Sequence, residues 1–482
     1  MFLGLDLGTG SVKALVLDEG GEVRGEGSAP YRVHAPSPGW AESDPQDWWI
    51  AAAEATRAAT GPRGERIEAV GLSGQMHGVV LSDEAGSPVR PAITWADARA
   101  REQLEAYGRL DTGLRGRLGN PPWVGMAGPS LLWLRDNEPE NYRAARWALQ
   151  PKDWLRLRLT GEAASEPTDA SATLLYDVEG DGWAFDVVEA LGLRAELLAS
   201  LKDPARVAGQ LGREAADYFR LPAGTPVAAG AADTAAAVLG SGLRPGAVQL
   251  TVGTGGQIVA LRDEPVAYPE GGVHLYRAAT GHLWYSMAAV QNAGLALEWA
   301  RGLLGASWPE VYEEAFSVPA GAEGVTFLPY LTGERTPHFD PDVRGAWSGM
   351  GLKHGRGHLM RAALEGVGFS LRQALEALEK TGLRAPELLL GGGGASYALY
   401  RQLLASVLRR PLRVLPDANV SATGAAILGG MAVGAYPSDL DAELPGAARD
   451  PAEEEVVEPA EDQEAYEEAY RRYEQSYPSH PE

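Results

Sequence analysis

Cysteine is absent from the 482-residue chain. This absence excludes disulfides, thiolate nucleophiles, iron–sulfur clusters and zinc sites built on cysteine. The sequence also lacks an apolar run of the roughly 18 residues that a membrane-spanning helix needs, and it enters a strand-like run directly, without a basic region and a cleavage site. We therefore expect a cytoplasmic protein with no membrane partner.

Positive charge is scarce as well, since 42 lysines and arginines stand against 65 acidic residues and leave a net charge of −23. Phosphate backbones are bound by clustered Lys and Arg, so no nucleic-acid partner is expected. About half of the excess lies in residues 437–482, which hold 15 acidic and three basic residues. This composition favours an acidic, solvated tail with a short amphipathic helix near residues 464–477 over an acidic segment that binds a partner.

Length and internal repetition indicate more than one domain. A chain of 482 residues exceeds one ordinary core, so two domains, or three, are expected. Apolar strand candidates at Phe2–Leu7 and Val12–Leu17 enclose the loop LGTGSVK. After Pro245 the same plan restarts in GAVQLTVGTGGQIVALRDEPV, where Gly253–Gly255 repeats the triplet of Gly8–Gly10. The repeated triplet and its flanking strands favour a duplicated domain with a cleft between the copies.

The loop LGTGSVK differs from two common phosphate-binding loops. The chain has no Gly-Lys dipeptide, so it has no P-loop. A Rossmann fingerprint needs a glycine where Lys13 stands and a helix afterwards, whereas VKALVLDEGGEV predicts a strand that ends in a turn. The loop therefore joins two strands of a hairpin, where glycines admit an anion close to backbone N–H groups and the hydroxyls of Thr9 and Ser11 add donors. A hairpin turn without a ligand is the alternative, and the second copy at Thr254 favours phosphate binding from both sides of a cleft.

A third glycine cluster stands in LLLGGGGASYALYRQLLA, residues 388–405. The pattern predicts a buried strand, a glycine turn and a helix that begins near Ser396. A flat ring or a phosphate can lie against bare backbone at such a helix N-terminus. A close crossing of strand and helix without a ligand explains the same pattern, and the cluster alone does not separate the two interpretations.

The three stretches carry a family resemblance. In this order, DLGTGSVK, VGTGG and GGGGAS resemble the two phosphate hairpins and the adenosine motif of the actin-like, ribonuclease-H-like ATPase superfamily. Segments between them are similar to the FGGY carbohydrate kinases within it, and most closely to the xylulokinases. These segments are GLSGQMHGVVL, PGWAESDPQDWW, PAITWADAR, LQPKDWLRLRLTGE, FLPYLTGERTPH and RGAWSGMGLKHGRGHLMRAALEGVGF. The resemblance runs from Phe2 to about Tyr436 and leaves out most of the acidic tail.

The resemblance implies a fold and an activity. The fold is the α/β, two-domain actin-like ATPase (ribonuclease H-like) fold, with duplicated domains around a central cleft. The N-terminal kinase domain would span residues 1–244 and hold the sugar site and the first phosphate hairpin. The C-terminal kinase domain would span residues 245–436 with the second hairpin and the adenosine motif, before the tail at 437–482. The activity is phosphorylation of D-xylulose to D-xylulose 5-phosphate with ATP and Mg²⁺, and a homodimer is one expected state.

The resemblance also assigns roles to two aspartates. Asp6, at the end of the first strand, would orient Mg²⁺ or its water beside the transferred phosphoryl group. Asp233 would take the proton from the sugar hydroxyl. It is the only acidic residue between Asp217 and Asp263, within a run of Ala and Gly. Because an idle buried carboxylate costs stability, this isolation favours a catalytic task over the alternative of a helix N-cap.

The remaining roles follow the same motifs. The residues implied to contact ATP are Gly8, Thr9, Gly10, Ser11, Lys13, Gly253, Thr254, Gly255, Gly393, Gly394 and Ala395. The residues implied to contact the sugar are Gln75, Met76, His77, Trp95, Asp97 and Asp233. A satisfied structural histidine is the alternative for His77, and a domain interface is the alternative for Trp95, Asp97 and Arg99. Arg335 and His338 fit a sugar site and interdomain packing equally well.

Some positions depart from the family pattern near the sugar. Ala96 stands where the family usually has Asn, Ser130 where Lys is frequent, and Thr234 follows Asp233 where Asn is usual. Asp6 and Asp233 are both present, so these departures concern the identity of the sugar rather than phosphoryl transfer. A kinase for another ketose or polyol is therefore the nearest alternative.

Other classes of protein explain fewer of the motifs. An ATP-binding switch of the actin or chaperone type has no use for Gln-Met-His-Gly together with Asp233. A non-catalytic sugar sensor would be expected to have lost Asp6 or Asp233, or to carry a DNA-binding segment. A glycosidase with two carboxylates would leave all three glycine motifs unexplained.

Overall fold

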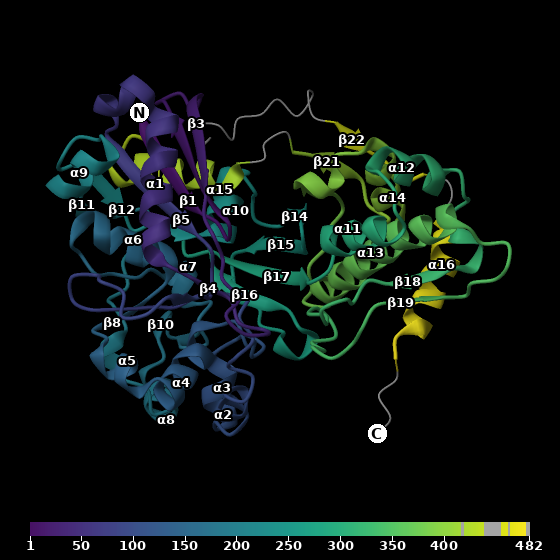
Figure 1. Ribbon diagram of the computed structural model, residues 1–482, viewed down its shortest axis with the longest axis horizontal. Coiled ribbons are helices and arrows are strands. Elements are labelled where there is room, and N and C mark those ends of the chain that lie inside the picture. The colour runs from purple at the N-terminus through teal and green to yellow at the C-terminus, as the bar shows by residue number, and fades with distance from the viewer. Residues whose placement is uncertain (416–418, 438–454, 461–462, 479–482) are drawn as a thin grey trace.

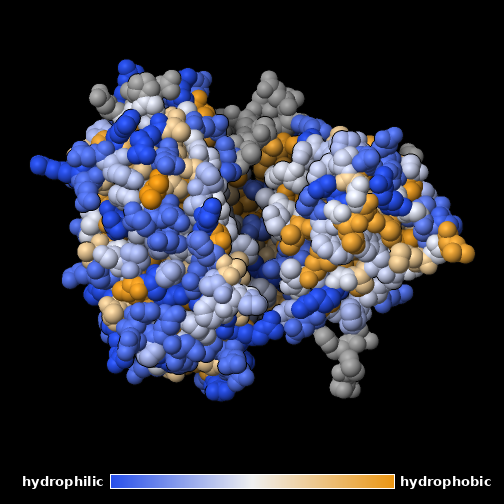
Figure 2. Space-filling view, viewed as in Figure 1, coloured by the Kyte–Doolittle hydropathy of each residue, from blue (hydrophilic) through white to orange (hydrophobic). Residues whose placement is uncertain are grey.

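The computed structural model describes residues 1–415, 419–437, 455–460 and 463–478. It has two lobes, each built on a seven-stranded sheet that helices cover (Figure 1). Figure 2 shows a hollow between the lobes. The predicted α/β architecture of two lobes around a central cleft is therefore confirmed.

The sheet of the first lobe has the order β11, β12, β5, β1, β2, β3, and β13 also pairs with β5. β1 runs antiparallel to β2 and parallel to β5. Residues 8–10 join β1 to β2, so the predicted hairpin is confirmed. The bounds are β1 Phe2–Leu7, β2 Ser11–Leu17, β3 Val23–Pro30, β5 Ala69–Gly74, β11 Val207–Gln210, β12 Pro226–Ala228 and β13 Ala231–Ala232.

The sheet of the second lobe repeats this plan. Its order is β16, β17, β15, β14, β20, β21, β22. β14 runs antiparallel to β15 and parallel to β20, as β1 does with β2 and β5. The bounds are β14 Val248–Val252, β15 Gly256–Arg262, β16 His274–Arg277, β17 Trp284–Val290, β20 Leu388–Gly391, β21 Leu412–Val414 and β22 Val456–Val457. The duplication predicted from the glycine triplets is thus present in the strand topology.

Helix α1 of the first lobe begins and ends at clear signals. In α1, Asp44 caps the first turn by accepting from the backbone N–H of Gln46 at 2.9 Å, Pro45 fills the first helical position, and Gly61 ends the helix. The helices of this lobe are α1 Pro45–Thr60, α2 Leu104–Gly108, α3 Thr112–Arg117, α4 Ala127–Asn137, α5 Pro139–Ala144, α6 Pro151–Thr160, α7 Pro167–Ala170, α8 Phe185–Ala190, α9 Arg213–Phe219 and α10 Asp233–Gly240.

The second lobe has long helices around its sheet. α13, Arg356–Glu379, packs on β15 and β17 and is buried along most of its length. The other helices here are α11 Gly294–Leu303, α12 Trp308–Phe316, α14 Ala398–Leu408 and α16 Gln463–Ser476. Short strand pairs lie outside the two large sheets: β4 Glu42–Ser43 with β7 Ala92–Ile93, β6 Val80–Ser82 with β8 Trp147–Leu149, β9 Tyr176–Asp177 with β10 Gly182–Trp183, and β18 Thr326–Leu328 with β19 Ala346–Ser348.

One late helix, α15 (Val420–Ala432), covers the sheet of the first lobe (Figure 1). It lies so close to β1 and β5 that a Cβ atom on Gly4 would overlap the carbonyl oxygen of Ala422, and one on Gly71 would overlap that of Ala425. Only glycine allows this approach. The boundary between residues 244 and 245 stays a prediction, but α15, within residues 245–436, completes the first lobe.

The acidic tail is more than solvated chain. The short helix predicted near residues 464–477 is present as α16. Tyr466, Ala469, Tyr470 and Tyr473 form a buried stripe along it, and β22 extends the second sheet. The expectation of a solvated segment is therefore wrong for α16, because its acidic residues share the helix with a tyrosine face that packs on the second lobe. Residues 438–454, 461–462 and 479–482 of the predicted tail lie outside the described residues.

Within the described ranges, none of the helices combines the length and the apolar surface that a bilayer crossing requires.

Candidate active site

Strands of the first sheet bring three polar residues to one edge. Asp6 is near the end of β1, Gln75 follows β5, and Asp233 follows β13 directly. Ser73 links these strands, because it pairs with Asp6 on one side and with Ala231 on the other. Its hydroxyl donates to Oδ1 of Asp6 at 2.9 Å. Since ligands of such sheets bind beyond the carboxyl ends of the strands, this edge is the candidate site.

The two aspartates share one electrostatic environment. Burial raises the pKa of Asp6, while the hydrogen bond from Ser73 and the charge of Lys13 act against that rise. Burial also raises the pKa of Asp233 to about 7, and the Asp6 carboxylate adds to the rise. Oδ1 of Asp233 accepts from the backbone N–H of Thr234 at 2.6 Å and from its hydroxyl at 3.1 Å. A carboxylate with a pKa near neutrality is suited to take up a proton in a reaction.

The first glycine hairpin lies beside these carboxylates. The Tyr31 hydroxyl donates to the carbonyl of Gly8, and the indole N–H of Trp95 donates to the Thr9 hydroxyl at 2.9 Å. Gly10 is exposed, and a Cβ atom there would meet no other atom within 4 Å. Lys13 lies opposite Asp6 in the strand register. Tyr31 and Trp95 therefore hold Gly8 and Thr9 of the turn, while the backbone at Gly10 stays exposed to solvent. An anion-binding turn requires such an exposed backbone.

The second hairpin connects β14 to β15 and lies against the start of α11. The carbonyl of Gly253 accepts from the N–H of Gly294 at 2.9 Å, and the carbonyl of Thr254 accepts from Leu295 at 2.9 Å. The predicted hairpin at Gly253–Gly255 is thus present, on the other side of the cleft from the first.

The third glycine cluster packs on the end of β14. Residues 393–395 form one short 3-10 turn between β20 and α14, so the predicted order of strand, glycine turn and helix is correct, with the helix beginning at Ala398. Side chains at Gly392 and Gly394 would collide with Val252. The cluster and the second hairpin are therefore neighbours in space.

A pocket of about 370 Å³ opens between this glycine turn and two helices. Its walls are largely aromatic and bare backbone, contributed by Gly294, Leu297, Trp308, Tyr312, Gly393, Gly394, Ser396 and Tyr397. The rings of Tyr312 and Tyr397 stack at 3.8 Å with an angle of 9° between their planes. A pocket with aromatic faces beside glycine backbone suits a flat heterocycle such as adenine.

Gln75 lies between the hairpin and the strand ends. Its amide Nε2 donates to the Tyr31 hydroxyl at 3.2 Å and lies 3.5 Å from the carbonyl oxygen of Gly8. Its carbonyl oxygen, Oε1, is buried and has no hydrogen-bond partner among the described residues. The side chain thus touches the phosphate hairpin, although the sequence motif suggested sugar contact, and it retains an unused acceptor.

His77 and Met76 lie where the first lobe meets β16 and β17 of the second lobe. Nδ1 of His77 is 2.8 Å from the carbonyl oxygen of Ala172, which only accepts, so Nδ1 carries the proton and Nε2 is an acceptor. Burial lowers the pKa of His77 to about 4, so the ring is neutral. Met76 is buried, with its sulfur 3.8 Å from the Tyr285 hydroxyl. A neutral, fixed imidazole can accept a directional hydrogen bond from a sugar hydroxyl.

Trp95 and Asp97, which are close in sequence, make contacts of different kinds. Trp95 contacts the phosphate hairpin through Thr9, as described above. Asp97 is buried, and its carboxylate bonds Arg99 and the backbone N–H of Ala41, at 2.7 Å and 2.6 Å. Arg99 also pairs with Glu42 at 2.7 Å. The structure therefore joins Trp95 to the site, whereas the observed contacts of Asp97 are those of a structural ion pair.

Arg335 and His338 occupy different places. Arg335 is buried, with Nη2 2.8 Å from Nε2 of His274 and its guanidinium over the ring of Trp123 in the first lobe. His338 lies 3.2 Å from Gln373 and stacks on Tyr477 inside the second lobe. Arg335 thus bridges the lobes, while His338 belongs to the core of one of them.

One cluster of buried charged side chains was not predicted from the sequence. Lys152 on α6 is fully buried, and its amine lies 2.7 Å from Asp153, 2.9 Å from Glu166 and 2.8 Å from Asp169. Arg156 pairs with Asp153 at 2.9 Å. The only local signal was four charged residues within the helix PKDWLRLRLT, among its apolar residues.

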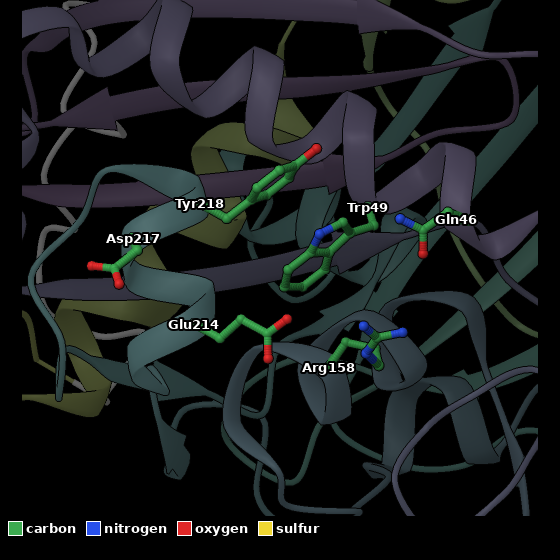
Figure 3. A pocket seen from close by; sticks show the side chains of 6 residues that line it. All are labelled: Gln46, Trp49, Arg158, Glu214, Asp217 and Tyr218. Atoms are coloured by element: carbon green, nitrogen blue, oxygen red, sulfur yellow. The ribbon is translucent and has the colours of Figure 1, made fainter.

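The pocket in Figure 3 is not part of this site. It has a volume of about 480 Å³ and is lined by Gln46, Trp49, Arg158, Glu214, Asp217 and Tyr218. The Trp49 ring stacks on Tyr218 at 5.7 Å and lies under the guanidinium of Arg158. None of its residues adjoins the glycine hairpins or the two aspartates.

The residues at the strand ends fit ATP and Mg²⁺. Burial and the nearby Asp6 carboxylate raise the proton affinity of Asp233, so the two carboxylates together provide negative charge for a dication, and the exposed backbone at Gly10 can provide a donor for a phosphate. Among the described residues no group of three or more His, Asp or Glu could hold a metal alone. A Mg²⁺ ion here would thus take most of its ligands from phosphates and water, as is usual for this ion.

Comparison with known proteins agrees with this geometry. The family described as "FGGY family of carbohydrate kinases, N-terminal domain" matches residues 1–240, and the corresponding C-terminal domain family matches residues 248–433. A xylulose kinase of Escherichia coli (strain K12) is 36% identical over 432 residues, which cover 89% of each chain.

Solved structures give the same result. One described as a "xyloylose kinase" from Brucella ovis has a TM-score of 0.89 and 35% identity, over 99% of this chain and 98% of that one. A gluconate kinase from Lactobacillus acidophilus has a TM-score of 0.90 and 25% identity, over 98% and 96%.

Proposed function

The chain belongs to the FGGY family of carbohydrate kinases, and from this premise we propose that it phosphorylates D-xylulose with ATP to give D-xylulose 5-phosphate. That it is a sugar kinase follows from the family. The identity of the sugar rests on similarity to curated xylulose kinases. The carrying observation in the structure is the pair Asp6 and Asp233, which meet at the strand ends between a glycine hairpin and the Gln-Met-His stretch.

Asp233 is proposed as the general base. A sugar hydroxyl is a weak nucleophile at neutral pH, and the base removes its proton as the oxygen bonds the γ-phosphorus and ADP leaves. The position of Asp233, at the strand ends beside Asp6, supports this role. Its raised pKa supports it too, because the group can hold the proton until the product departs.

Asp6 is proposed as the residue that holds Mg²⁺, directly or through water. When bound, the metal would neutralise charge on the phosphates. The hairpin at Gly8, Thr9, Gly10 and Ser11, with Lys13, would bind phosphates from one side of the cleft, and Gly253, Thr254 and Gly255 from the other. The aromatic pocket beside Gly393, Gly394 and Ala395 would take the adenine.

The sugar would lie deeper in the cleft than ATP, beside the Gln75–His77 stretch of the first lobe. Nε2 of His77 and Oε1 of Gln75 are free acceptors for its hydroxyls, and Met76 would supply an apolar wall. Asp97 remains a predicted contact through the family motif alone. Because water competes with the sugar as a nucleophile, closure of the lobes on the sugar is the expected safeguard. The cytoplasmic location and the homodimer stay predictions.

An initial-rate panel with ATP and Mg²⁺ tests the substrate. It compares D-xylulose with D-ribulose, hexuloses, glycerol and D-gluconate, the last because of the structural similarity to a gluconate kinase. We expect the highest kcat/KM for D-xylulose. A tenfold higher value for any other compound would reassign the sugar and leave the family unchanged.

Asp233→Asn tests the base. The amide keeps the oxygen that accepts from Thr234, so the variant should fold and bind ATP, while kcat should fall by roughly 10²-fold or more. A folded variant that binds both substrates and turns over within threefold of the parent would remove Asp233 from this role.

A further inference from the structure

A fully buried ion cluster lies behind the candidate base. The amine of Lys152 is within 2.9 Å of the carboxylates of Asp153, Glu166 and Asp169, and all four side chains have no exposed surface. Burying several charges costs free energy that mutual attraction seldom recovers in full. Such a cluster therefore calls for a role beyond general stability.

Glu166 connects the cluster to the start of α7. Its carboxylate accepts from the backbone N–H groups of Thr168 and Asp169, at 2.6 Å and 2.9 Å, at the start of α7. It also accepts from the Thr168 hydroxyl at 2.8 Å. Because Lys152 contacts the same oxygen, Oε1, at 2.9 Å, Glu166 cannot shift without breaking both sets of bonds.

The Thr168 hydroxyl makes the last connection. While it donates to Glu166, it accepts from the backbone N–H of Ala232 at 2.7 Å. Ala232 immediately precedes Asp233, the first residue of α10. A chain of bonds thus runs from Lys152 on α6 through Glu166 and Thr168 to the peptide next to the carboxylate.

We propose that Lys152, Glu166 and Thr168 are positioning residues that hold the start of α10 and thereby aim the carboxylate of Asp233. The inference rests on the catalytic role proposed for Asp233. The hydrogen bonds that Oδ1 of Asp233 accepts come from the adjacent Thr234, so the direction of the carboxylate depends on the local backbone. A displacement of about 1 Å in a reacting group can cost about 10²-fold in rate.

The ionic character of the chain suits this task. Bonds to charged partners are shorter and roughly twice as strong as bonds between neutral groups. Glu166 therefore fixes the Thr168 hydroxyl more firmly than a neutral acceptor would. Ala232 is then held by a hydroxyl with little freedom to turn.

Thr168→Val tests the inference, because valine keeps the shape of threonine and removes both bonds of the hydroxyl. We expect kcat with sugar and ATP to fall at least tenfold while KM for the sugar stays within threefold. Thr168→Ser restores the hydroxyl and should bring kcat to within threefold of the parent. If Thr168→Val keeps parental kcat, or if the serine variant is as slow as the valine variant, the inference is wrong.

Thr160→Val is the matched control. The Thr160 hydroxyl also donates to one oxygen, the carbonyl of Arg156, at 2.9 Å, and accepts from one backbone N–H, that of Glu162, at 3.1 Å. It lies at the far end of α6 and touches no residue of the site. We expect kcat within twofold of the parent. A loss equal to that of Thr168→Val would show that removing a threonine hydroxyl with two such bonds has this effect away from the site, and it would overturn the inference.

A double-mutant cycle separates this inference from the proposed function. If Thr168 acts through Asp233, Thr168→Val should not slow Asp233→Asn by more than twofold. A further tenfold loss would overturn the inference. If Asp233→Asn has a low kcat and Thr168→Val has the parental kcat, only the positioning role is wrong. If Asp233→Asn has a kcat close to that of the parent, Asp233 is not the base and the positioning role is wrong as well. Thermal unfolding confirms that each variant folds, and Thr168→Ala replaces the valine variant if valine does not fold.

Discussion

The indole N–H of Trp95 donates to the hydroxyl of Thr9 at 2.9 Å, so a residue from a sugar-kinase motif holds the phosphate hairpin. A loop expected to bind the sugar is thereby attached to the loop expected to bind ATP. Through this contact, a shift of one loop on binding its substrate would move the other loop.

Trp95→Phe keeps the aromatic packing and removes this bond. A hydrogen bond of this kind contributes roughly 0.5–1.5 kcal/mol. We therefore expect KM for ATP to rise about twofold to tenfold, with a smaller change in KM for the sugar. Steady-state kinetics with each substrate varied in turn provides the measurement. A rise confined to the sugar would place Trp95 against the sugar instead.

Gly10→Val tests the phosphate hairpin. Because a side chain at Gly10 meets only open space, the variant should fold with nearly the parental melting temperature. The added methyl groups would stand where a phosphate approaches the backbone, so KM for ATP should rise at least tenfold and KM for the sugar less than threefold. Gly116→Val, another exposed glycine with open space around it, is the control and should leave both constants unchanged. Equal changes in both constants for Gly10→Val would make the turn merely structural.

The pKa of Asp233 sets a pH dependence. Burial first, and the Asp6 carboxylate second, raise the pKa of Asp233 to about 7. A general base works only when ionised, so kcat/KM for the sugar should fall tenfold per pH unit below this pKa. Bound Mg²⁺ would offset the Asp6 charge, so the break should lie no higher than about pH 7. A profile that is flat from pH 5 to 8 in the parent contradicts an essential base with this pKa.

The same pKa shift predicts a gain in stability when the base is removed. The pKa of Asp233 is raised in the folded state above its ordinary value of 3.8, so the stabilisation present at low pH is lost as the pH rises through about 7. Asparagine does not titrate. Asp233→Asn should therefore gain stability over the parent between pH 5 and pH 8, by about 3 kcal/mol at most.

Urea unfolding of the parent and of Asp233→Asn at the two pH values measures this gain. Asp217→Asn, at an exposed aspartate on α9, is the control. The difference in free energy of unfolding between this variant and the parent should be the same at pH 5 and pH 8. A gain equal at pH 5 and pH 8 would mean that Asp233 does not titrate in this range.

Local features of the site were predictable from the sequence. The two hairpins and the strand–turn–helix at residues 388–405 follow from glycine triplets between alternating strands, which are short-range signals. Asp6 and Asp233 were identified as a pair only through the family resemblance. Their proximity depends on β1, β5 and β13 pairing across more than 200 residues, which spacing and composition do not reveal.

Other features depend on tertiary packing. The contact of Trp95 with Thr9 and the ion pair of Asp97 with Arg99 are set by the path of one loop, which no local pattern specifies. The tyrosine stripe of α16 was visible in the sequence, but the acidic composition around it favoured a solvated tail. The cluster at Lys152 was hidden because a charged residue in an apolar helix is recognisable as buried only when its partners are known.

The placement of α15 affects how the protein can be made. The first strand, at Phe2–Leu7, is covered by α15, which ends at Ala432. The ribosome must therefore synthesise about nine-tenths of the chain before this face of the first sheet can be covered. Until then Gly4 and Gly71 leave a bare groove on the nascent lobe, open to chaperones or to misplaced apolar segments. A fragment of residues 1–244 should thus need a supplied α15 peptide to become a stable lobe, and the two halves of the duplication are not independent units of biosynthesis.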